Sequence, residues 1–183
     1  GTVTAGGASN ITAGKDVNVT TGSITSSGAG NITAGGDVNL SAGTVTAGGV
    51  SDINAGNDVK VTTGSITSTD AGNITAGNDV NLNSSTLVAG ADSVITATNG
   101  NIALGSSGIT VNGVNNGLTL DANGSVMQDA AAAGITADNL TVESGKTQQL
   151  LSQQNKVKSL TIKGKNAGSS LMVNGVTRFN GTT

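Results

Sequence analysis

The chain has 183 residues, a formal net charge of −3, and neither cysteine nor histidine. It therefore has no disulfides or thiolate ligands, and it lacks the most common catalytic base and zinc ligand. One phenylalanine and no tryptophan or tyrosine also remove the aromatic platforms on which sugars and single-stranded nucleic acids usually stack. The composition argues against an enzyme and a nucleic-acid-binding protein, and we predict no catalytic, cofactor-binding or metal-binding residues.

A 21-residue repeat occupies residues 1–84. Its clearest marker is an aspartate that recurs at Asp16, Asp37, Asp58 and Asp79. Isoleucine recurs at the same interval, at Ile11, Ile32, Ile53 and Ile74. The units also pair, because residues 1–42 and 43–84 are identical at roughly 32 of 42 positions. A period of this length is typical of a solenoid protein.

Apolar residues within each unit alternate with Thr or Asn, as in Val3-Thr4-Ala5, Ile11-Thr12-Ala13 and Val17-Asn18-Val19. This alternation predicts three short β-strands, each with its apolar side chains on one face. The Gly, Asn and Asp residues between them favour sharp bends. We therefore predict an all-β fold, a single-stranded parallel β-helix, or β-solenoid, with coils of about 21 residues that stack at about 4.8 Å. The repeated isoleucines should stack inside it.

The repeat becomes irregular after Ser84 but continues as strand-like segments. These lie at 94–97, 101–104, 109–111, 118–120, 125–127, 135–137, 140–142, 157–162, 171–173 and 176–179. We predict that residues 85–183 continue the β-helix with longer loops, which gives roughly eight or nine coils and a rod on the order of 40 Å long. Residues 129–133 and 146–154 are the only stretches with helical character, and both are predicted to be loops that bulge from a corner.

Charge is distributed unevenly along the chain. Residues 1–138 carry ten acidic and two basic side chains, whereas residues 139–183 carry one glutamate and six basic side chains. The basic end is interpreted either as a solvated face or as a contact for an anionic glycan or lipopolysaccharide. Apolar runs of two or three residues predict no transmembrane helix, and a start without a charged and apolar leader suggests a segment of a longer exported protein.

The phrases ITAGKDVNV, ITAGGDVNL, INAGNDVKV and ITAGNDVNL resemble the haemagglutinin repeats of filamentous-haemagglutinin-like exoproteins. These are large adhesins and contact-dependent inhibition proteins exported by two-partner secretion. GLTLDANGSVMQ, GITADNLTV and NKVKSLTI are similar to a neighbouring repeat type in the same proteins. The resemblance implies a right-handed β-helical shaft that is exported through a partner barrel in the outer membrane. At the bacterial surface it would serve attachment to a host-cell, bacterial or glycan receptor, or toxin delivery.

Calcium binding is one alternative that the sequence leaves open. Gly56-Asn57-Asp58 is a fragment of the calcium-binding nonapeptide, in which oxygen cages form between successive coils. The fragment occurs only once per 21 residues and without its leading Gly-Gly-X-Gly. We therefore favour Asx turns at a corner for the repeated aspartates.

Ice binding and polysaccharide catalysis are two further alternatives. Thr2-Val3-Thr4 and Thr44-Val45-Thr46 would stack into rows of outward hydroxyls, as on an ice-binding surface, although Ser23, Ser65 and Val88 interrupt the threonines. A polysaccharide lyase or hydrolase on this fold would need paired carboxylates in a groove, and the outward strand positions carry almost none.

The two ends of an isolated solenoid expose unpaired strand edges. Gly1 to Val3 and Val176 to Phe179 carry no proline or dense charge that would block the addition of another strand. We therefore predict end-to-end association. The basic carboxy-terminal third, placed against the acidic first coils of a neighbour, favours head-to-tail order.

Overall fold

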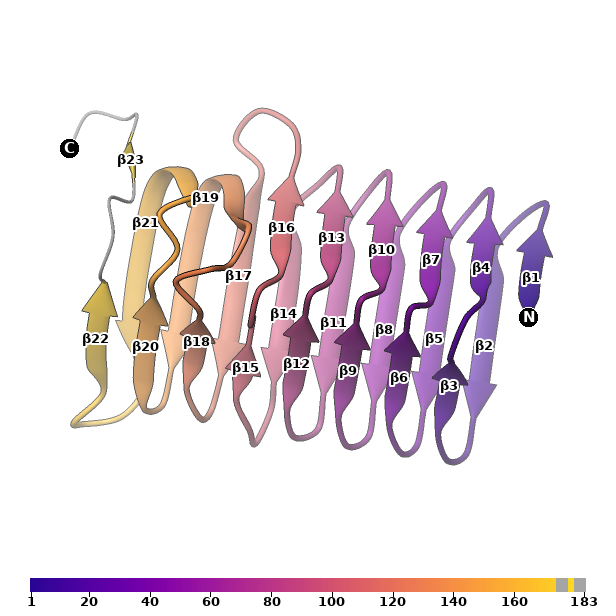
Figure 1. The fold of residues 1–183 in the computed structure, drawn as a ribbon, viewed down its shortest axis with the longest axis horizontal. Helices are drawn as coiled ribbons and strands as arrows, with labels where there is room; N and C mark the ends of the chain where they lie inside the picture. Colours follow the sequence, from indigo (N-terminus) through magenta and orange to yellow (C-terminus); the bar gives the residue numbers. More distant parts are fainter. Residues whose placement is uncertain (174–177, 180–183) are drawn as a thin grey trace.

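A computed structural model describes residues 1–173 and 178–179 as an all-β molecule without helices. Its strands wind into a right-handed parallel β-helix of about eight turns (Figure 1). Each turn has three sides, and every side pairs in parallel with its copy in the next turn. The predicted fold class is confirmed.

Three faces run along the solenoid. The first face consists of β1 (Thr2–Ala5), β4 (Ser23–Ser26), β7 (Thr44–Ala47), β10 (Ser65–Ser68), β13 (Thr86–Ala89) and β16 (Gly108–Val111). The second consists of β2 (Ser9–Ala13), β5 (Gly30–Ala34), β8 (Ser51–Ala55), β11 (Gly72–Ala76), β14 (Ser93–Ala97) and β17 (Gly117–Ala122). The third consists of β3 (Val17–Val19), β6 (Val38–Ser41), β9 (Val59–Thr62), β12 (Val80–Asn83), β15 (Ile102–Ala103), β18 (Val126–Gln128), β20 (Thr147–Leu150) and β22 (Ser170–Val173).

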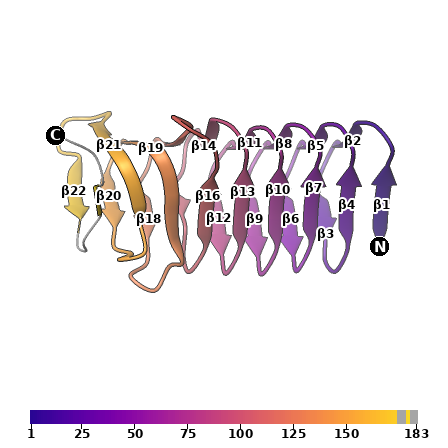
Figure 2. The same ribbon diagram turned by 90° about the horizontal axis from the view of Figure 1, so that it is seen from above.

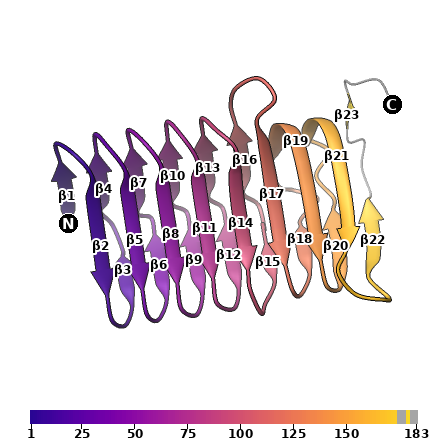
Figure 3. The ribbon, with the colours of Figure 1, turned by 180° about the vertical axis from the view of Figure 1, so that it is seen from behind.

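Near the carboxy-terminal end the corner between the first two faces disappears. β19 (Gly134–Ser144) and β21 (Lys156–Gly164) each run without a break from the first face to the second. β23 (Arg178–Phe179) pairs with β21. One turn earlier, the link between β16 and β17 protrudes as a loop that the other turns lack (Figure 3).

The core is a set of stacked apolar columns. On the second face one column passes through Ile11, Ile32, Ile53, Ile74, Ile95, Leu120, Val142 and Ile162. From Ile32 to Val142 every member of this column is fully buried. The predicted stacking of the isoleucines is confirmed, and the column extends through the irregular half of the chain.

Close stacking explains why glycine recurs at the corner between the second and third faces. A Cβ on Gly56 would lie 2.2 Å from the carbonyl oxygen of Gly35, and one on Gly77 would lie 1.9 Å from that of Gly56. Because no side chain fits so close to a carbonyl oxygen, the backbone at Gly56 and Gly77 requires glycine. The next coil has Thr98 at the equivalent position.

The two segments predicted to be loops have different structures. Residues 129–133 form a turn closed by a hydrogen bond from the Ala132 N–H to the Asp129 carbonyl, as predicted. The prediction for residues 146–154 is wrong, because β20 occupies Thr147–Leu150. Gln148 and Leu150 point into the core in alternation with partly buried neighbours, and the strand pairs with β18 and β22. Of the last predicted strand, 176–179, residues 176–177 lie outside the described residues.

Candidate functional site

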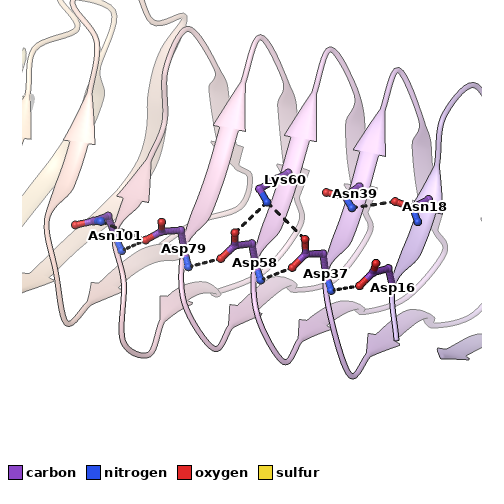
Figure 4. Close-up of polar contacts among 8 residues, drawn as sticks. All are labelled: Asp16, Asn18, Asp37, Asn39, Asp58, Lys60, Asp79 and Asn101. Carbon is purple, nitrogen blue, oxygen red and sulfur yellow. Dashed lines mark hydrogen bonds and ion pairs between the residues drawn. The ribbon is translucent and has the colours of Figure 1, made fainter. Parts of the chain in front are cut away.

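The repeated aspartates form a ladder that follows one corner of the solenoid (Figure 4). Asp16 Oδ1 accepts a hydrogen bond from the backbone N–H of Asp37 at 2.9 Å, and Asp37 Oδ1 accepts one from Asp58 at 3.2 Å. The ladder continues through Asp79 to Asn101. These bonds join neighbouring coils, whereas the predicted Asx turns would lie within one coil. The carboxylates therefore tie successive coils together.

Lys60 neutralises the middle of this ladder. Its Nζ lies 2.9 Å from Asp58 Oδ2 and 3.5 Å from Asp37 Oδ2. Partial burial raises the pKa of Asp58, but the hydrogen bonds from Lys60 and from the Asp79 N–H outweigh it and lower that pKa below its ordinary value. The hydrogen bond to Asp58 raises the pKa of Lys60. Both groups stay charged at neutral pH, as a structural ion pair requires.

The ladder geometry does not assemble a calcium cage. Each coil contributes one carboxylate, and its Oδ1 already accepts a backbone N–H. Calcium takes six to eight oxygen ligands around one point. Across residues 1–173 and 178–179, no three Asp, Glu, His or Cys side chains come together as a metal site.

Side-chain amides form similar ladders on the outer surfaces of the second and third faces. Asn31 Nδ2 donates to Asn10 Oδ1 at 3.0 Å, and Asn73 Nδ2 donates to Asp52 Oδ1 at 2.9 Å. On the third face, Asn39 Nδ2 donates to Asn18 Oδ1 at 2.9 Å. These outward polar groups are therefore satisfied by the next coil.

Three lysines of the basic end form ion pairs between coils. Lys158 binds Asp138 at 2.8 Å and Lys163 binds Glu143 at 2.7 Å. Lys165 reaches across an intervening coil to pair with Asp121. The hydrogen bonds from Lys158 and from the backbone N–H of Asn115 lower the pKa of Asp138.

These pairs favour the interpretation of the basic end as a solvated face. Among the lysines of this end, Lys146 and Lys156 have no acidic partner within the described part of the chain. Asp121 and Glu143 are neighbours in register, but each is paired with a lysine. They therefore do not form the open carboxylate pair that glycoside hydrolysis needs.

A buried amide pair was missed by sequence reasoning. Gln128 and Asn155 exchange two hydrogen bonds of 2.8 Å, and Asn155 Oδ1 also accepts the N–H of Ile135 at 2.8 Å. Gln128 is 0% exposed and Asn155 is 1% exposed. The pair fixes the corner between the third and first faces near residues 129–133. One feature of the sequence could have indicated it. Gln128 follows Val126 by two residues in the same strand, so the two side chains point to the same, buried side.

The surface has open hollows. One hollow, about 480 Å³, is a trough along the third face with Lys60, Asn81, Met127, Asp129 and Gln149 among its lining residues. Asp129 is the only carboxylate that lines it. A second hollow, about 290 Å³, lies at the amino-terminal end, where Val3, Ile11 and Val19 are incompletely covered. A third hollow, about 310 Å³, is lined by Asp138 and Lys158. Lys158 is in an ion pair with Asp138, as Lys60 of the trough is with Asp58.

Within the residues that the structure describes, no helix is long and apolar enough to cross a membrane. Comparison of the chain with protein-family models, with curated proteins and with solved structures gave no match.

Proposed function

We propose that this chain is a structural shaft segment of a large secreted bacterial exoprotein. In this proposal it is displayed at the outer cell surface and serves attachment to cells or surfaces as part of an adhesin. The segment itself is not an enzyme and takes no cofactor. Its partners are an outer-membrane transporter barrel during secretion and a receptor on a host cell, a bacterium or a glycan.

The observation that carries the proposal is the continuity of the stacked columns. The apolar column of the second face extends from Ile11 to Ile162, through both the regular and the irregular repeats. Aspartate and amide ladders connect the same coils on the outside. A rod of coils stacked in this way is extended and keeps one direction, as a structural shaft requires.

The composition supports export in an unfolded state. The chain has no cysteine, no tryptophan or tyrosine and no proline, so disulfides, most bulky rings and slow prolyl isomerisation do not obstruct transport or refolding. Outside the cell each added coil buries apolar side chains against the previous coil, which supplies a driving force without ATP. The resemblance of its repeats to those of filamentous-haemagglutinin-like exoproteins points to the same role.

Antibodies raised against the purified chain test this proposal on the bacterium that produces it. We expect them to label intact cells, and we expect external protease to remove the label. The purified chain or the antibodies should also reduce attachment of the cells. Labelling only after the cells are permeabilised would contradict the proposed location, and unchanged attachment after removal of the label would contradict an adhesive role.

A further inference from the structure

The first face carries two straight rows of hydroxyl side chains on its outer surface. One row passes through Thr2, Ser23, Thr44, Ser65 and Thr86, and the other passes through Thr4, Thr25, Thr46 and Thr67. The strands β1, β4, β7, β10 and β13 that hold them stand side by side in a straight row (Figure 2). The hydroxyls therefore form a two-dimensional array over five successive coils.

These hydroxyls differ from the polar groups of the other two faces. Within the described part of the chain, none of the nine side chains donates or accepts a hydrogen bond to protein, whereas the outward Asn and Asp side chains bond to the next coil. The array also contains no charged residue. Charged side chains point outward on the second and third faces, as at Asp52 and Lys60.

The array is also conformationally fixed. Coils repeat at about 4.8 Å along the axis, and residues i and i+2 of one strand are roughly 6.6 Å apart. Seven of the nine side chains are threonines, whose branched Cβ restricts χ1 and so fixes both the hydroxyl and the methyl. Binding to a fixed array costs little conformational entropy. The best ligand is uncharged, repeats in two dimensions and both donates and accepts hydrogen bonds.

We propose that this hydroxyl array binds the surface of ice. The surface of ice is an uncharged array of water molecules that repeats in two dimensions, and each molecule can meet a hydroxyl as donor or acceptor. The serines keep the hydroxyl and lose only the methyl. Val88, which follows Thr67 in the second row, keeps the methyl but not the hydroxyl. The binding surface therefore ends at the fifth coil.

This activity is additional to the shaft role and does not depend on it. A shaft that binds ice would attach the producing cell to ice directly. Failure to bind ice would leave the proposed shaft unaffected, and failure of surface display would leave ice binding by the purified chain unaffected.

Partition of the purified chain between slowly growing ice and the remaining liquid tests the proposal. We expect the chain to be enriched several-fold in the ice fraction relative to an inert protein of similar size and charge, and to inhibit recrystallisation. Thr46→Lys, at the centre of the array, should abolish both effects, and Thr25→Lys is a second variant of the same kind. Thr33→Lys places the same charge on the exposed surface of the second face and should retain both effects.

Thermal unfolding of each variant shows whether its coils remain folded. Exclusion of the unchanged chain from ice, to the same extent as the inert protein, would overturn the proposal. Equal loss of ice binding in folded Thr46→Lys and folded Thr33→Lys would also overturn it, because the binding surface would then not be the first face. A change in sedimentation caused by Thr46→Lys, without any enrichment of the unchanged chain in ice, would assign the array to contact between two copies instead.

Discussion

Ile53 shows how much one residue contributes to this fold. It is 0% exposed and stacks between Ile32 and Ile74. Ile53→Asp would leave an unpaired carboxylate in an apolar column, so we expect the neighbouring coils to unfold together. Circular dichroism during heating should show a lower midpoint or no cooperative transition. Thr33→Lys, on the exposed side of the adjacent strand, should change the free energy of unfolding by less than about 0.5 kcal/mol. An unchanged midpoint for Ile53→Asp would refute the assigned register.

Thr63 occupies a conformation that branched residues rarely adopt. Its φ is 54°, and Ala42 and Ser84 have similar values at the same corner of neighbouring coils. Because asparagine tolerates the left-handed region, Thr63→Asn should raise the free energy of unfolding by about 1 kcal/mol. Gly64→Ala is a control that should lower the free energy of unfolding, because the added Cβ would lie 2.6 Å from the Gly43 carbonyl oxygen. Urea denaturation measures both changes, and destabilisation by Thr63→Asn would show that the corner is not strained.

Residue positions were predictable where they depend on local alternation. The alternation of Ile and Ala with a polar residue was enough to place Ile53 inside and Thr33 outside. The backbone of Ala42, Thr63 and Ser84 was not predictable, because none of these residue types favours a positive φ. Each aspartate bonds to the next coil and not within its own, which depends on how closely the coils stack. The sequence of a single 21-residue unit does not specify that distance.

Among the elements, the aspartate ladder joins successive coils at the corner between the second and third faces. Asp58→Ala would leave the backbone N–H of Asp79 without its acceptor, which should cost about 1–3 kcal/mol. Asp58→Asn keeps an oxygen acceptor, as Asn101 does at the same corner, and should cost less. Chemical denaturation at pH 7 distinguishes the two variants. Equal losses would mean that the charge of Asp58, and not its hydrogen bond to Asp79, stabilises the corner.

The lowered pKa of Asp58 gives the ladder a pH dependence. A carboxyl whose pKa is lower in the folded state stabilises the fold fully above its unfolded value, about 3.9. This contribution decreases as the pH falls through the folded pKa, because protonation breaks the pair with Lys60. We expect the free energy of unfolding to fall below pH 4 and to fall less steeply in Asp58→Asn. Parallel pH profiles for the two proteins would contradict this assignment.

Strands that repeat were easier to predict than strands that appear once. One sequence pattern recurs in β2, β5, β8 and β11, so the prediction of each of these strands is supported by the other three. β20 has the sequence Thr-Gln-Gln-Leu, which lacks apolar alternation. Its Gln148 is buried, and its Nε2 donates to the Lys163 carbonyl. Gln128 is likewise buried only because Asn155, 27 residues away, completes its hydrogen bonds. Such partners are visible only after the coils are stacked.

At the scale of the whole molecule, the amino-terminal coil has an open edge. β1, β2 and β3 each pair with one strand in the described structure, and Val3 is 46% exposed. We expect copies of the isolated chain to associate through this edge. Val3→Lys should reduce the association, because a charged edge strand resists further pairing. Sedimentation velocity over a range of concentrations measures the effect. A strictly monomeric chain at high concentration would contradict the prediction.

The coils of this rod are expected to be interchangeable units of length. Small-angle X-ray scattering of a variant with residues 43–84 duplicated tests this expectation most directly. Two added coils should lengthen the particle by about 10 Å and leave its cross-sectional radius unchanged. A wider cross-section, or a variant that unfolds or keeps its original length, would contradict the account.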